Sequence, residues 1–218
     1  MAIRFKQTLQ IGNVRLELRA RIGIGNKRAH AHAFHHATPS SLKGSTVIGL
    51  RTPLALICSF KVLFDLKNNP YSRRIMTNIY VHQDLHEMNL YPCAYSMTFN
   101  VTKEPGKDKL VLNAVLNQRS QDILAANNWN VCQYSLLLMM IAQVCDMEAG
   151  ELVHVIADCH IYDRHIPVIK ELISRKPYPA PTVKLNPEIK DFYKFTTNDL
   201  IVENYETWPQ IKNIPIAV

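Results

Sequence analysis

The sequence predicts an α+β protein in which a mixed, largely antiparallel sheet packs against one long, buried central helix. Two strand-like runs, 94–101 and 110–116, are joined by a Pro-Gly-Lys-Asp segment at 105–108, which is typical of an antiparallel hairpin. Residues 131–147 are almost wholly apolar over a helical length, which indicates a buried helix. Strands and helices do not alternate strictly, so an all-parallel sheet is not expected.

Local start and stop signals predict the other elements. The central helix has Asn130 at its expected N-cap position and Gly150 shortly after its end. Pro70 and Pro177 each end a further helical pattern. The expected strands are 14–18, 75–81, 94–101, 110–116, 152–156, 182–185 and 200–204, and the expected helices are 54–66, 131–147 and 163–176.

The positive charge of the chain is confined to its first sixty residues. The chain has 218 residues and a formal net charge of +7. Residues 1–60 contain nine Lys or Arg and a single acid, Glu17, whereas the other 158 residues contain 16 basic and 17 acidic side chains. Because the larger part is close to neutral, a nucleic-acid partner is not the first expectation.

Cysteine usage and hydropathy indicate a cytoplasmic protein. The five cysteines show no CxxC spacing, and the first residues lack the apolar run of a secretory signal, so reduced thiols are expected. No apolar run is long enough to cross a bilayer, so no membrane association is expected. The four histidines between His30 and His36 match no standard zinc pattern, and no metal site is expected there.

A cysteine and an arginine suggest nucleophilic chemistry. A lone cysteine in a strand is usually a small buried residue. A cysteine nucleophile, however, reacts as the thiolate, which a neighbouring cation stabilises. Cys93 follows a proline at the start of a strand-like run, and Arg119 belongs to a polar motif, Gln-Arg-Ser-Gln-Asp, at 118–122. Arg73 and Arg74 add paired guanidinium groups, which suit phosphate oxygens.

In order and spacing these residues resemble the active-site sequence of the thymidylate synthase family, from about Lys61 to Val218. The resemblance implies that family's fold and the reductive methylation of dUMP to dTMP. It also implies 5,10-methylenetetrahydrofolate as co-substrate, no metal, and a homodimer in which Arg73 and Arg74 reach the partner's phosphate site. Cys93 would add to C6 of the uracil ring.

The resemblance also implies roles for individual residues. Asn130 would pair with N3–H and O4 of uracil, whereas an aspartate there would favour cytosine. Asp122 and Ala217, in the closing tail, would contact the folate. The implied catalytic residues are Cys93, Arg119 and Asn130, and the implied substrate-binding residues are Arg73, Arg74, Gln118, Arg119, Ser120, Gln121, Asp122, Asn130, His160, Ile161 and Tyr162.

Residues 1–60 do not match the family. They lack its phosphate-binding arginine loop, its catalytic glutamate and its folate-covering tryptophans; the first tryptophan is Trp129. We therefore expect an atypical basic segment, 1–60, and a catalytic domain, 61–218. Two interpretations are open: a divergent segment that rebuilds the site, or a truncated or frameshifted copy with impaired turnover. The abrupt change in charge near residue 60 favours the second.

Two alternative functions would differ from the synthase in measurable properties. A folate-dependent deoxyuridylate hydroxymethyltransferase would use the same cysteine but let water capture the exocyclic methylene. The absence of the family's folate-covering tryptophans from residues 1–60 is consistent with this alternative. A basic RNA-binding protein built on the nucleotide pocket would lose affinity steeply with salt. The synthase ranks first and the RNA-binding protein last.

Overall fold

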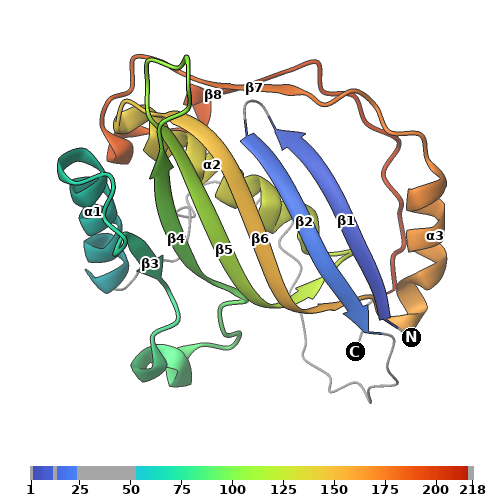
Figure 1. Ribbon diagram of the computed structural model, residues 1–218. Helices are drawn as coiled ribbons and strands as arrows, with labels where there is room; N and C mark the ends of the chain where they lie inside the picture. Colours follow the sequence, from blue (N-terminus) through green and yellow to red (C-terminus); the bar gives the residue numbers. More distant parts are fainter. Residues whose placement is uncertain (1, 12–13, 24–52, 216–218) are drawn as a thin grey trace.

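The computed structural model describes residues 2–11, 14–23 and 53–215. Its centre is a six-stranded sheet in the order β1-β2-β6-β5-β4-β3, and a two-stranded sheet, β7-β8, lies apart from it (Figure 1). The pairs β1-β2, β4-β5 and β3-β4 are antiparallel, and β2-β6 and β5-β6 are parallel. The strands are β1 (Ala2–Ile11), β2 (Val14–Gly23), β3 (Met76–Asn78), β4 (Ala94–Thr102), β5 (Val111–Asp122), β6 (Glu148–His160), β7 (Thr182–Leu185) and β8 (Leu200–Glu203).

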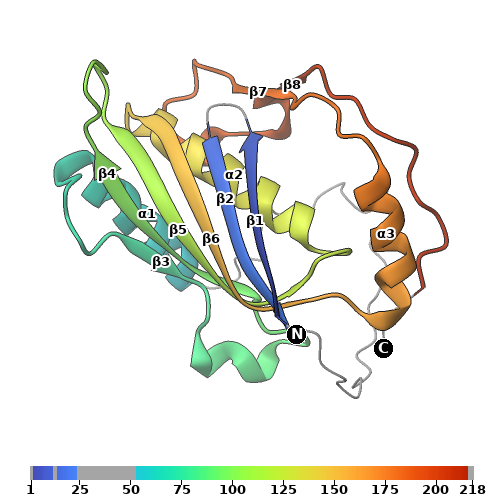
Figure 2. The same ribbon diagram turned by 45° about the vertical axis from the view of Figure 1, so that its right-hand side comes forward.

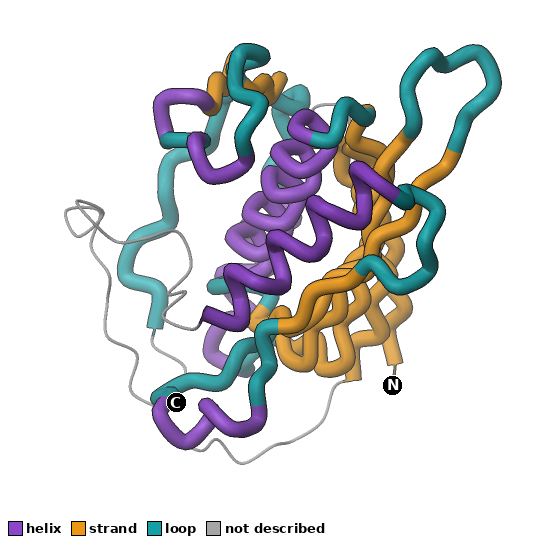
Figure 3. Tube along the Cα trace, turned by 90° about the vertical axis from the view of Figure 1, so that its left-hand side faces the viewer, coloured by secondary structure: helices purple, strands orange, loops and turns teal. Residues whose placement is uncertain are grey.

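The helices α1 (Pro53–Asn68) and α2 (Asn127–Val144) lie on one face of the large sheet (Figure 3). The buried residues of α2 recur at helical spacing, which brings one stripe of the helix into the core. Within this core, Leu138 of α2, Leu112 of β5 and Leu152 of β6 are fully buried. The predicted mixed α+β fold with a central buried helix is thus confirmed.

The opposite face of the sheet carries none of the described helices (Figure 2). Val115 of β5 and Val155 of β6 are 38% and 45% exposed on it. Two neighbouring strands therefore present apolar side chains on a face that no described element covers.

The hairpin β1-β2 extends the sheet beyond β6. Leu16 pairs with Leu152 of β6, which is buried, whereas Arg19 pairs with the exposed Val155. The expected strand at 14–18 is thus part of a longer strand.

The turn between β4 and β5 confirms the predicted hairpin. Lys107 N–H donates to Glu104 O at 3.3 Å, and Gly106 has a φ of +78°. That φ lies in the left-handed region, which glycine adopts without a Cβ clash.

The ends of the central helix were predicted wrongly. It begins at Asn127, so Asn130 lies within its first turn, and Ala126 occupies the N-cap position without a side-chain cap. Gly150 belongs to β6 rather than to the end of the helix. A Cβ at Gly150 would come within 2.3 Å of Asn113 Oδ1, so close packing between strands explains this glycine.

Two further predicted elements are shorter in the structure. Only Met76–Asn78 of the expected strand 75–81 forms strand β3. The expected helix 163–176 is divided into a 3-10 turn, Asp163–His165, and α3 (Ile166–Ser174), with a proline in the first turn of α3. The remaining 3-10 turns are His82–Glu87, Phe192–Lys194 and Thr197–Asp199.

Across residues 2–11, 14–23 and 53–215, no helix has both the length and the apolar character needed to cross a membrane.

Candidate active site

Cys93 directly precedes β4, at the end of the sheet where β5 and β6 finish. A register shift between Ala94 and Ser96 interrupts the pairing of β4 with β5 at this point. The backbone N–H of Arg119 still donates to Cys93 O at 2.9 Å and fixes the start of the strand. β-bulges commonly orient side chains beside active sites, and here the cysteine remains half-buried and accessible.

The guanidinium of Arg119 lies beside the Cys93 thiol. Its Nε donates to Pro92 O at 3.0 Å and its Nη2 to Tyr91 O at 2.8 Å. The same Nη2 lies 3.7 Å from Cys93 Sγ. Two carbonyl contacts therefore hold a positive charge beside the sulfur, as the predicted role of Cys93 requires.

The other described cysteines differ from Cys93. Burial raises the pKa of the Cys145 and Cys159 thiols to about 11, with Asp158 adding to the shift at Cys159. Burial also raises the pKa of Cys132. These thiols therefore stay protonated near neutral pH, and none has a described arginine contact.

Arg119 also lines an open pocket of about 350 Å³. Its other walls come from Asn78, Tyr80, His82 and Tyr95. Tyr80 makes edge-to-face contacts with both Tyr91 and Tyr95, at centroid distances of 6.3 and 6.2 Å. The pocket thus combines a cation with aromatic walls, and its volume is within the range of small-molecule sites.

A buried amide, Gln118, joins three elements at the site. Its Oε1 accepts from Asn130 Nδ2 at 3.2 Å and from His154 Nε2 at 2.8 Å. Its Nε2 donates to Ser120 O at 2.7 Å. Because the amide group is planar, the bond from Asn130 Nδ2 to Gln118 also sets the direction of Asn130 Oδ1, which can act as an acceptor.

Gln121 and Asn130 complete this network from neighbouring elements. Asn130 Nδ2 is 3.5 Å from Gln121 Oε1, and Gln121 Nε2 donates to Asn127 Oδ1 at 3.3 Å. Gln118 and Gln121 are both almost fully buried. Buried amides whose groups are paired hold a fixed orientation, so the network positions Asn130.

His154 of β6 was not predicted as a site residue. It is 1% exposed, and burial lowers its pKa from 6.5 to about 4. The neutral ring carries its proton on Nε2, because Gln118 Oε1 accepts from that atom. The only sequence signal was a polar residue on the otherwise apolar side of an alternating strand.

Asp122 lies at the end of β5, in register with His160 of β6. Its Oδ1 accepts from Leu124 N–H at 2.9 Å and Ala125 N–H at 3.3 Å, which form a turn leading to α2. Its side chain is 18% exposed, and Oδ2 lies 4.0 Å from His165 Nδ1. Asp122 therefore keeps one oxygen as an acceptor at the site.

His160 and Tyr162 meet in an edge-to-face contact at 5.1 Å. The prediction that both lie on one strand was wrong, because β6 ends at His160. Tyr162 and Ile161 belong to the connection that follows it. Parallel pairing of β5 with β6 nevertheless brings this segment beside Asp122.

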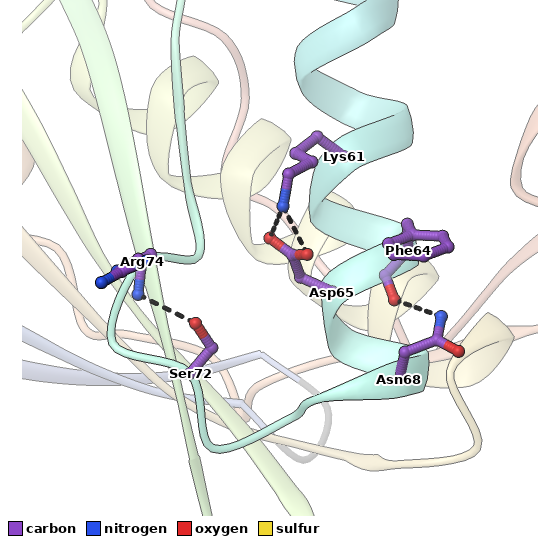
Figure 4. Close-up of polar contacts among 6 residues, drawn as sticks. All are labelled: Lys61, Phe64, Asp65, Asn68, Ser72 and Arg74. Atoms are coloured by element: carbon purple, nitrogen blue, oxygen red, sulfur yellow. Dashed lines mark hydrogen bonds and ion pairs between the residues drawn. The ribbon is translucent and has the colours of Figure 1, made fainter.

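Arg73 and Arg74 belong to the turn between α1 and β3, where Figure 4 shows Arg74 beside Ser72. The next residue, Ile75, accepts through its carbonyl from Phe99 N–H at 2.9 Å, well along β4 from Cys93. Both are exposed, and Arg74 N–H donates to Ser72 Oγ at 3.3 Å. On α1, Lys61 pairs with Asp65 at 2.5 Å. At the end of this helix, Asn68 Nδ2 donates to Phe64 O at 2.7 Å, just before the turn. Within the described parts of the chain, Cys93 is contacted by Arg119 and not by either of these arginines.

Two predicted features lie outside the described residues. These are Ala217 and the histidine run His30–His36. The remaining predicted residues, from Cys93 to Tyr162, gather at one end of β4, β5 and β6.

The fold and the site together define an α+β protein with a cysteine beside a fixed arginine and a buried amide network. The family model for thymidylate synthase matches residues 59–218. The chain is 43% identical to the thymidylate synthases of Bacillus subtilis subsp. natto and of Bacillus phage phi3T over 145 residues, which are 66% of this chain and 50% of each relative. The chain belongs to the thymidylate synthase family, as its motifs predict.

A solved structure supports the same conclusion. Thermostable thymidylate synthase A from Bacillus subtilis superposes with a TM-score of 0.66 at 39% identity, over 72% of this chain and 55% of that protein. The chain spans about half the length of these curated relatives.

Proposed function

We propose that this protein is a thymidylate synthase that methylates dUMP to dTMP with 5,10-methylenetetrahydrofolate as co-substrate. The observation that carries the proposal is Cys93 held 3.7 Å from the Arg119 guanidinium. The match of residues 59–218 to the family supports it. The relatives named above are all thymidylate synthases, which favours this activity over the hydroxymethyltransferase.

The Cys93 thiolate forms the first covalent bond of the proposed reaction. It adds to C6 of uracil, and the electron pair of the C5–C6 double bond moves toward C5 and O4. C5 thereby becomes a nucleophile for the one-carbon unit. Covalent attack replaces one difficult step by easier ones, and the thiolate leaves again when the product forms.

Asn130 reads the uracil ring in this proposal. Its oxygen can accept from N3–H, and negative charge grows on O4 when Cys93 adds. Both N–H groups of Asn130 face Gln118 and Gln121, at 3.2 and 3.5 Å, so a bond to O4 requires the longer contact to be exchanged. Gln118, which also accepts from His154 at 2.8 Å, keeps the amide plane in place during this exchange.

Asp122 is suited to the folate. Its Oδ2 remains an acceptor while Oδ1 is engaged by backbone N–H groups, and a pterin ring offers N–H donors. When bound, the co-substrate supplies the one-carbon unit and the hydride. Ala217 is proposed to contact it from the tail.

The nucleotide phosphate requires cations from two subunits. Arg119, with Ser120 and Gln121, would bind it from within the subunit, and His160, Ile161 and Tyr162 would line the sugar. Arg73 and Arg74 are exposed and free to reach a second copy. The uncovered face with Val115 and Val155 offers a surface for a second copy in the proposed homodimer. The proposed location is the cytoplasm.

The division into a segment 1–60 and a catalytic domain 61–218 remains part of the proposal. It predicts that limited proteolysis trims the chain to a core that starts near Lys61. If residues 1–60 instead rebuild the missing parts of the site, they should resist digestion and be required for turnover.

The test is turnover of dUMP and 5,10-methylenetetrahydrofolate by the purified protein, with Cys93→Ser as the control. Equal amounts of dTMP and dihydrofolate, lost in the control, would support the proposal. A hydroxymethyl product, identified by mass, would contradict it. Binding of dUMP without turnover would indicate an impaired member of the family.

A further inference from the structure

We propose that His165 is a positioning residue that couples the C-terminal tail to the folate-binding carboxylate of Asp122. The inference rests on the proposed function, because Asp122 is assigned to the folate there. Three sets of contacts carry it: the path of the tail, the two sides of the His165 ring, and the bonds of Asp122.

The tail, defined here as residues 204–215, runs beside α3 (Figures 1 and 2). Two hydrogen bonds tie it near the C-terminal end of this helix. Trp208 Nε1 donates to Lys176 O at 2.8 Å, and Arg175 Nη1 donates to Pro209 O at 3.0 Å. A third tie, from His165 to Pro215, lies at the opposite end of α3, beside the candidate active site.

The His165 ring lies between the tail and Asp122. It is 3% exposed, and its Nε2 is 2.7 Å from Pro215 O. Since a carbonyl only accepts, Nε2 carries a hydrogen and donates it. Nδ1, on the other side of the ring, lies 4.0 Å from Asp122 Oδ2 and has no hydrogen-bond partner.

Asp122 has one oxygen fixed and the other facing this ring. Oδ1 is held by two backbone N–H groups, so Oδ2 can orient only by rotation about that anchor. The buried ring limits this rotation, and Tyr162 packs against it edge-to-face at 5.6 Å. A shift of the ring would therefore displace Pro215 and release Asp122 Oδ2 together.

The consequence is a coupling between folate binding and docking of the tail. Folate bound to Asp122 would favour the ring position that holds the end of the tail, and a docked tail would favour the carboxylate position that binds folate. Such coupling is reciprocal, because both events select the same arrangement. In the proposed function dUMP does not contact the ring itself and is linked to it only through Tyr162, so the affinity for dUMP should change much less than the affinity for folate.

Three substitutions at His165 separate this role from simple core packing. His165→Leu fills space but removes the hydrogen bond to Pro215 O and the ring nitrogen that faces Asp122 Oδ2. His165→Gln carries an amide N–H near the position of Nε2, so it can restore the bond to Pro215 O. His165→Asn carries its amide near the position of Nδ1 and cannot reach Pro215 O. Arg175→Leu is the matched control, because it removes a tail contact far from Asp122.

The experiment measures three quantities for each folded variant. Titration calorimetry gives the affinity for tetrahydrofolate with dUMP at saturation, and the affinity for dUMP alone. Hydrogen–deuterium exchange followed by mass spectrometry gives the protection of peptides from residues 204–215. Circular dichroism checks the fold, and the Gln and Asn variants keep the test available if the Leu variant does not fold.

We expect His165→Leu and His165→Asn to weaken tetrahydrofolate binding about tenfold, which corresponds to the loss of one buried hydrogen bond. In the same two variants the protection of the tail from exchange should fall, whereas the affinity for dUMP should stay within about twofold of the wild type. His165→Gln should keep the protection of the tail. Arg175→Leu should loosen the tail near Pro209 without changing folate affinity. Unchanged folate affinity in His165→Leu, or an equal loss in Arg175→Leu, would overturn the inference. Failure of the wild-type protein to bind tetrahydrofolate would instead overturn the proposed function, and the inference with it.

Discussion

Arg119 holds Cys93 at two points: its backbone N–H donates to Cys93 O at 2.9 Å, and its Nη2 lies 3.7 Å from Cys93 Sγ. Removing the guanidinium by Arg119→Ala should keep the backbone bond and remove the charge. We therefore expect alkylation of Cys93 by iodoacetamide at pH 7 to slow about tenfold, since the guanidinium 3.7 Å from the sulfur no longer stabilises the thiolate. Peptide mapping by mass spectrometry measures this rate.

The other described cysteines serve as internal controls for that measurement. Burial raises the pKa of Cys132, Cys145 and Cys159, so their labelling should be slow in both proteins and should rise with pH. Equal labelling rates for Cys93 in the wild type and in Arg119→Ala would show that the arginine does not activate the thiol.

Asn130→Asp should change which base the site prefers. The substitution places a carboxylate oxygen against Gln118 Oε1, where Asn130 Nδ2 now donates at 3.2 Å. It also removes the amide donor that O4 of uracil needs, whereas cytosine offers an amino group in its place. We expect dUMP affinity to fall about a hundredfold and dCMP affinity to rise.

A matched substitution, Asn127→Asp, adds the same charge one turn away on α2. It keeps the oxygen that accepts from Gln121 Nε2 at 3.3 Å. Calorimetric titration of both variants with dUMP and dCMP makes the comparison. If Asn127→Asp altered base preference as much as Asn130→Asp does, charge alone would explain the effect.

Local patterns predicted the elements of this fold better than the contacts between them. The β4-β5 turn was predictable, because Pro105 and Gly106 specify it locally. The parallel pairing of β5 with β6 was not predicted, since it joins residues such as Asp122 and His160 that are far apart in the sequence. Strand pairing of this kind depends on the packing of α2 across both strands.

The candidate site was predictable where the family motif identified its residues. Cys93 and Arg119 were assigned in this way, and the structure brings them into contact. His154 and His165 were missed because an isolated histidine carries no local signal of its partners. The N-cap prediction for Asn130 failed because a capping preference is weak compared with tertiary contacts, here with Gln118.

Burial of His154 predicts an acid-sensitive contribution to stability. Its pKa falls from 6.5 to about 4 on folding, so the unfolded chain binds the additional proton between these values. The contribution is fully present above pH 6.5 and is lost as the pH falls toward 4, up to about 3 kcal/mol. Denaturant unfolding of the wild type and His154→Gln across this range should show the difference. Parallel stability curves for the two proteins would exclude His154 as the cause.

The proposed exchange of Arg73 and Arg74 between subunits predicts complementation of inactive variants. Cys93→Ser lacks the nucleophile, and a variant with both Arg73→Ser and Arg74→Ser lacks the cations, so each homodimer should be inactive. In a mixed dimer, the subunit with intact Cys93 receives the intact arginines of its partner, and one native site forms. Random mixing in equal amounts should therefore recover about a quarter of the wild-type activity per subunit. Co-refolding followed by the turnover assay measures the recovery, with sedimentation to verify the dimer. If the mixture were dimeric but as inactive as its components, the arginines would act on the phosphate site of their own subunit and not on that of the partner.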